Sequence, residues 1–87
     1  MDKYIKMGWH IRDDGIFEFN YAPLSLEDKL KEKGFEIVFK EVYVDSDYCT
    51  LWVKMKQDSD VKVLLGLVRE RNQQVVDDYK KARGITW

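Results

Sequence analysis

The residues of this chain most suited to chemistry are its single histidine, His10, and its single cysteine, Cys49. A cysteine nucleophile needs a base within hydrogen-bond reach, and a zinc site would need carboxylates beside both residues. Both lie in stretches where apolar and polar side chains alternate, as in a half-buried strand. By that alternation His10 points outward and Cys49 points into the core. We therefore expect no catalytic pair, no metal and no cofactor, and an inert thiol at position 49.

Closely spaced aspartates are the other candidates for a cation site or for acid–base chemistry. The pairs are Asp13/Asp14, Asp45/Asp47, Asp58/Asp60 and Asp77/Asp78. Each pair has an ordinary explanation as a turn former, a helix cap or solvated helix surface. The glycines are scattered without the spacing of a phosphate-binding loop. We therefore expect that the protein is not an enzyme.

Length and composition are those of one globular domain. The chain has 87 residues, of which 45% are hydrophobic and 36% charged, and its formal net charge is −1. Because cations and anions nearly balance, the net charge does not indicate a class of partner. The N-terminus lacks the apolar stretch of a signal peptide, and no segment approaches the roughly 20 apolar residues of a membrane span. With a lone cysteine that excludes an internal disulfide, we expect a cytoplasmic protein without membrane contact.

The periodicity of the chain predicts two hairpins, each followed by a helix. Residues 4–12 and 16–21 alternate as strands around a turn signal, and a short helix follows from 25 to 33. Residues 35–44 and 48–56 form the second hairpin, and a long helix runs from about 60 to 83, capped by Asp58 or Ser59. We therefore expect residues 1–87 to be a single α+β domain of order ββαββα, with a four-stranded antiparallel sheet and both helices on one face.

The third strand contains a change of phase. Ile37 and Phe39 have the inward parity, but Glu41 takes the next inward position, while Val42 is apolar on the other parity. A β-bulge, which inserts one extra residue into a strand, restores the alternation. We place the bulge near Lys40 and Glu41.

The outward face of the sheet is the expected binding surface, because it combines aromatic side chains with lysines. In the strand YCTLWVKMK, Trp52 has the same outward parity as Lys54 and Lys56, and tryptophan is a frequent interface anchor. Over the whole outward set, five cations oppose two anions, a net of +3 against −4 elsewhere. The candidate binding residues are Tyr4, Lys6, Arg12, Lys40, Tyr48, Trp52, Lys54 and Lys56.

These observations favour a small non-enzymatic binding protein that occupies a protein partner. It would act as a regulator, adaptor or inhibitor, of the kind that phages and other mobile elements often encode. The alternative is a single-stranded RNA or DNA binder, in which rings stack on bases and lysines follow phosphates, although the chain lacks the RNP1 run of RNA-recognition motifs. A plainer interpretation is that lysine stems lie over the indole and merely cover the sheet.

The long helix carries a second apolar spot besides the stripe that faces the sheet. Val63 and Leu67 are one helical turn apart and lie away from that stripe. Either Leu26 and Leu30 of the short helix cover this spot, or a partner or a second copy of the chain does. A homodimer is therefore an alternative to intramolecular packing.

Overall fold

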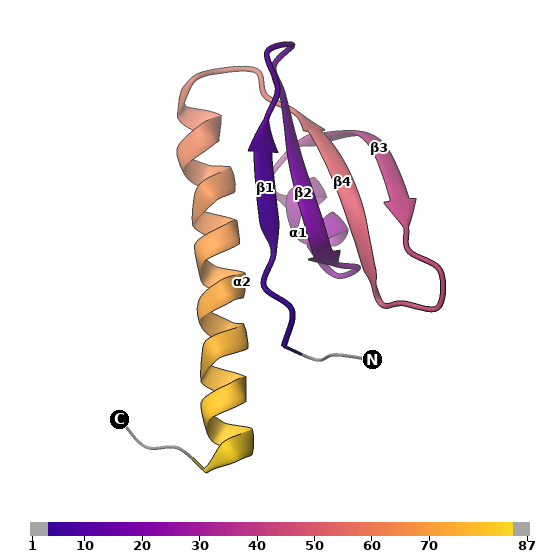
Figure 1. Cartoon of the computed structure of the whole chain (residues 1–87). Helices are drawn as coiled ribbons and strands as arrows, with labels where there is room; N and C mark the ends of the chain where they lie inside the picture. Colours follow the sequence, from indigo (N-terminus) through magenta and orange to yellow (C-terminus); the bar gives the residue numbers. More distant parts are fainter. Residues whose placement is uncertain (1–3, 85–87) are drawn as a thin grey trace.

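The computed structural model describes residues 4–84 and shows the order ββαββα (Figure 1). Neighbouring strands are antiparallel and form one sheet of order β1-β2-β4-β3. The elements are β1 (Gly8–Ile11), β2 (Ile16–Pro23), α1 (Leu26–Glu32), β3 (Glu36–Val42), β4 (Tyr48–Lys54) and α2 (Ser59–Arg83). The expected α+β class and element order are confirmed, although the first strand is shorter than predicted.

Both helices contribute to one core on one face of the sheet. The alternation of β2 and β4 places Phe17, Leu51 and Val53 on that face, and all three have no exposed surface. They join Leu30 of α1 and Leu64 of α2 in a single apolar cluster. Burying each such side chain contributes about 1.5–3 kcal/mol, so this shared core holds the helices on the sheet. In Figure 1, α1 lies behind the strands and α2 runs past the β1 side.

Trp9 lies on the helix face but at the edge of the sheet. It pairs with Phe19 across the β1–β2 ladder and stacks on Phe17, with 5.9 Å between the ring centroids. Because no strand within residues 4–84 lies beyond β1, the indole remains 48% exposed. The alternation of residues 4–12 predicts that Trp9 points inward. The direction is right, but the side chain is not fully buried.

The segment before β1 lies against α2 and not in the sheet. The Met7 amide donates to Asn72 Oδ1 at 2.6 Å, and Asn72 Nδ2 donates to the Met7 carbonyl at 3.0 Å. The Tyr4 ring meets Tyr79 of α2 edge-on, with 5.5 Å between centroids. Tyr4, which we expected on the outward sheet face, is therefore part of the α2 surface.

A β-bulge in β3 decides which of its side chains face the helices. The register against β4 shifts between Ile37 and Phe39, so Val38 is the extra residue. Phe39 consequently pairs with Trp52 on the outward face, and Lys40 turns toward the helices. The bulge was predicted, but it lies earlier than expected, so the predicted directions of Phe39 and Lys40 were both wrong.

The two helices begin at the predicted caps, but without the side-chain hydrogen bonds of a cap. Ser25 and Asp58 occupy the N-cap positions, but neither side chain bonds to the backbone of its helix. Asp60, inside the first turn of α2, accepts instead from the backbone amides of Lys56 at 2.8 Å and Gln57 at 3.2 Å. These donors favour the charged carboxylate and lower the pKa of Asp60.

Candidate binding surface on the outer sheet face

A continuous chain of hydrogen bonds crosses the outer face of the sheet, the face turned away from the helices. Trp52 Nε1 donates to Glu18 Oε1 at 3.0 Å, and Asn20 Nδ2 donates to Glu18 Oε2 at 2.9 Å. Thr50 Oγ1 donates to Asn20 Oδ1 at 3.4 Å, and the hydroxyl of Tyr43 lies 2.5 Å from that of Thr50. Since each bond restrains the next, the orientation of the Trp52 indole is fixed by polar partners from β2.

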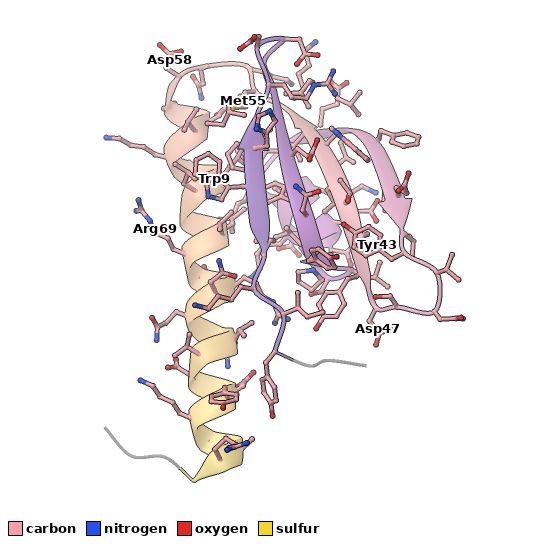
Figure 2. The ribbon with its side chains drawn as sticks, viewed as in Figure 1. Trp9, Tyr43, Asp47, Met55, Asp58 and Arg69 are labelled. Carbon is pink, nitrogen blue, oxygen red and sulfur yellow. The ribbon has the colours of Figure 1, made fainter. Side chains whose placement is uncertain are left out.

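The chain of hydrogen bonds ends at two tyrosines beside the β3–β4 turn, where Figure 2 labels Tyr43. Because Thr50 gives its one hydroxyl proton to Asn20, Tyr43 must be the donor to Thr50. The Tyr43 oxygen in turn accepts from the Tyr21 backbone amide at 3.2 Å, and the two rings meet with centroids 5.2 Å apart. Tyr21 has a positive φ of 54° within an irregularity of β2. The turn after β3 is thereby bonded to β2 across β4.

Phe39 and Trp52 form the centre of an exposed apolar patch on this face. Their ring centroids are 5.3 Å apart, so the Phe39 ring packs on the indole. Phe39 is 58% exposed and Val38 52% exposed, and Ile16 adjoins them along a shallow hollow. We call Ile16, Val38, Phe39 and Trp52 the outer patch. An apolar patch with a polar border is typical of a surface that binds another molecule.

The cations expected on this face are mostly elsewhere. Lys54 alone lies on the outer face of a strand. Lys40 faces the helices, and Arg12 forms an ion pair at 2.8 Å with an aspartate of the adjacent turn. Lys6 precedes β1 and Lys56 follows β4, so neither belongs to the sheet. Of the predicted cations, only Arg12, which lines the same hollow as Trp52, and Lys54 therefore lie near the outer patch.

The strand residues of the outer face carry a net negative charge. Glu18 lies opposite Trp52, Glu36 opposite Lys54, and Glu41 opposite Thr50. Cross-strand partners point to the same face, so three anions share this face with one cation, a net of −2. The expected charge of +3 is wrong. The bulge at Val38 exchanges Lys40 for Glu41 on this face, which accounts for two of the five units of difference. The other three units are Lys6, Arg12 and Lys56, which lie outside the strands.

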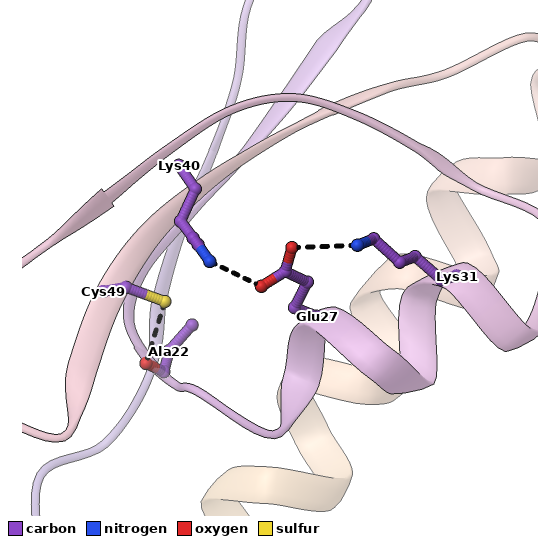
Figure 3. A network of polar contacts seen from close by, with 5 residues as sticks. All are labelled: Ala22, Glu27, Lys31, Lys40 and Cys49. Atoms are coloured by element: carbon purple, nitrogen blue, oxygen red, sulfur yellow. Dashed lines mark hydrogen bonds and ion pairs between the residues drawn. The ribbon is translucent and has the colours of Figure 1, made fainter.

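Lys40 is held on the helix face by a carboxylate of α1 (Figure 3). Its Nζ lies 2.8 Å from Glu27 Oε1, while Lys31 Nζ lies 3.1 Å from Glu27 Oε2. The two ammonium groups lower the pKa of Glu27, and Glu27 raises the pKa of Lys40. This small network ties β3 to α1 and removes the only cation of β3 from the outer surface.

Cys49 is buried as expected, at the side of the same network (Figure 3). Its Sγ donates to the Ala22 carbonyl at 3.6 Å, and burial raises the pKa of the thiol. His10 is exposed and pairs with Glu18 on the outer face, on the other side of the sheet from Cys49. Among residues 4–84, no three His, Cys, Asp or Glu side chains are grouped to hold a metal. No helix in this part of the chain is long and apolar enough to cross a bilayer.

The structure also places the remaining predicted contact residues. Tyr48 is 8% exposed, although it keeps the outward parity of Thr50 and Trp52 in β4 and is not part of the core cluster. Leu67 is 6% exposed and belongs to the same cluster as Leu26 and Leu30, so the short helix covers it. Val63, its neighbour on α2, remains 43% exposed. Of the predicted apolar spot, Leu67 is thus covered within the fold, and only Val63 remains at the surface.

Comparisons of the chain with protein-family models, with curated proteins and with solved structures find no match. Function must therefore be inferred from the surface itself. Sequence reasoning identified Trp52 but missed Phe39, Val38 and the bonding partners Glu18 and Tyr43. The change of phase in the alternation of β3 was the one feature of the sequence that could have predicted an outward Phe39. It did not fix the position of the bulge.

Proposed function

We propose that this protein is a non-enzymatic binding protein that docks a protein partner on the outer patch. The observation that carries the proposal is the exposed Phe39 ring resting on an indole whose orientation Glu18 fixes. Aromatic anchors held in place before binding lose little conformational entropy when the complex forms. Such rings, surrounded by a polar border, are the usual centre of a protein interface. The protein would act by occupancy, as a regulator, adaptor or inhibitor.

The charge of the outer face favours a protein over a nucleic acid. Single-stranded nucleic-acid binders place their stacking rings in a positively charged groove. Here Glu18, Glu36 and Glu41 share the face of the rings, with Lys54 as the one strand cation. Arg12, which also lines the hollow, is paired with Asp14. Anions at these positions repel phosphates but attract basic side chains. A reducing, cytoplasmic setting belongs to the same proposal and is supported by the single buried thiol.

The test compares two aromatic residues on opposite faces of the sheet. Phe39→Ala removes the more exposed ring of the outer patch, whereas Trp9→Ala removes a half-exposed ring from the helix face. Phe39 is a cleaner probe than Trp52, because Trp52 also bonds to Glu18. A partner is captured with the wild-type protein from lysate with and without nuclease treatment, and its Kd is measured for each variant.

Phe39→Ala should weaken the complex by about ten-fold or more, as expected for an interface anchor. Trp9→Ala should leave the Kd unchanged, and circular dichroism confirms that both variants are folded at the assay temperature. An unchanged Kd for Phe39→Ala would overturn the proposal. Loss of the complex on nuclease treatment would also overturn it and would favour nucleic acid as the ligand.

A further inference from the structure

β3 is an open edge of the sheet with an apolar character. It pairs with β4 and has no strand on its other side among the described residues. Val38, Phe39 and Val42 are 52%, 58% and 48% exposed. Edge strands usually carry an outward-pointing lysine or a proline to prevent pairing with other chains. Here the only lysine of β3, Lys40, is turned toward Glu27, so the outer side of this edge carries carboxylates and apolar side chains but no lysine.

We propose that the free edge of β3 receives an extended, basic segment of a protein partner as a fifth strand. This inference rests on the proposed function and names the kind of partner. Backbone hydrogen bonds along β3 would hold the segment, as in other cases of strand addition to a sheet edge. Side chains on the outer face of the added strand would then contact Phe39 and the outer patch.

The charge of the incoming segment follows from the charges of β3. The two charged outer-face residues of β3 are Glu36 and Glu41, which pair across the ladder with Lys54 and Thr50. Glu41 has no cation opposite it in the sheet. Opposite charges on facing strands stabilise pairing and like charges oppose it, by about 0.2–1 kcal/mol for each pair. An added strand with lysine or arginine facing these carboxylates is therefore favoured over an acidic one.

A second copy of the same chain fits this edge poorly. A two-fold axis pairs β3 with itself antiparallel, about one central residue. Centring on Lys40 or on Glu41 sets like charges directly opposite each other, which opposes pairing. Centring on Phe39 sets the bulge at Val38 opposite Lys40, which interrupts the ladder. Centring on Val42 runs half of the pairing past the end of β3. The inferred occupant is therefore a segment of a different protein.

The experiment uses synthetic peptides of about eight residues, a length typical of strands. The first alternates lysine with valine and phenylalanine, and the second has glutamate in place of every lysine. A third has the sequence of the first, with methyl groups on its central backbone nitrogens. The methyl groups remove the N–H donors needed to pair with β3 and keep the positive charge of the lysines. Binding is followed by backbone amide NMR shifts of the full-length protein.

The lysine peptide should shift the amides of residues 39–42 and bind about ten-fold or more tightly than the glutamate and N-methylated peptides. Glu41→Lys should reduce or reverse the preference for lysine. Glu32→Lys, the same charge change on the exposed surface of α1, should leave it intact. Absence of β3 shifts at millimolar peptide, equal binding of the N-methylated peptide, or equal effects of the two variants would each overturn strand addition.

The captured partner separates this inference from the proposed function. If Phe39→Ala loses the partner while Glu41→Lys binds it with unchanged Kd, the outer patch is the docking site and strand addition is wrong. If the lysine peptide adds to β3 while Phe39→Ala retains the partner, the edge is an acceptor and the proposed use of the outer patch is wrong.

Discussion

The two faces of β4 are stabilised in different ways. Toward the helices, Cys49, Leu51 and Val53 are fully buried among apolar side chains. On the outer face, Thr50 and Trp52 are held by directional hydrogen bonds to β2. Apolar packing depends on volume and tolerates swaps of similar shape, whereas a hydrogen-bond chain depends on each partner. The inner face therefore stabilises the fold, and the outer face orients an exposed aromatic pair.

The largest effect should come from the inner face. Leu51→Ala deletes a fully buried side chain at the centre of the core and should cost about 2–5 kcal/mol in free energy of unfolding. That is a large part of the total stability of a small domain, about 5–15 kcal/mol. Denaturant unfolding followed by circular dichroism measures the change. A cost below about 0.5 kcal/mol, as for an ordinary surface site, would contradict the assignment of this face.

A smaller effect is expected on the outer face. Thr50→Val keeps the shape of the side chain but removes the hydroxyl between Tyr43 and Asn20, and should cost about 0.5–1.5 kcal/mol because two half-buried partners lose a bond. The same unfolding measurement applies. A matching substitution, Thr50→Ser, keeps the hydroxyl and should retain the hydrogen bonds. Equal stability of Thr50→Val and the wild-type protein would show that the chain of bonds has no structural role.

The smallest effect is a pH dependence on the helix side of β3. The pKa of Glu27 is lowered from 4.5 by Lys40 and Lys31. A carboxylate whose pKa is lowered by folding contributes stability above its unfolded pKa, and that contribution is lost as the pH falls through the folded value. Wild-type stability should therefore drop below about pH 4.5 more than that of Glu27→Gln. Identical acid profiles of the two proteins would show that the ion pairs are screened by solvent.

The sequence predicted the inner face well, because a buried face imposes a strict alternation. Phe17, Phe19, Leu51 and Val53 alternate with polar residues and all have no exposed surface. A strand slipped by one residue would expose the whole set, so the pattern leaves little freedom. The order of the elements followed from the same pattern and from the turn residues between strands.

The outer face was predicted less well, because its composition depends on contacts between distant segments. Alternation shows that β3 changes phase, but a bulge at any of several residues would restore it. Its position at Val38 places Phe39 against Trp52 and Lys40 against Glu27, both from other elements. The sequence pattern does not predict which side chains from distant segments meet in this way. The displaced position of Tyr4 has a similar cause, since it follows from the bonds of Asn72 to the chain before β1.

The bulge has a consequence for insertions and deletions in this chain. Val38 has no partner in the ladder between β3 and β4. Its deletion would therefore leave Ile37 facing the helices and Phe39 facing outward. Such a deletion would satisfy the core, yet it would remove the local twist that a bulge adds and lengthen the flat edge. A longer flat edge pairs indiscriminately with other chains. Selection against aggregation can therefore preserve one residue that packing does not require.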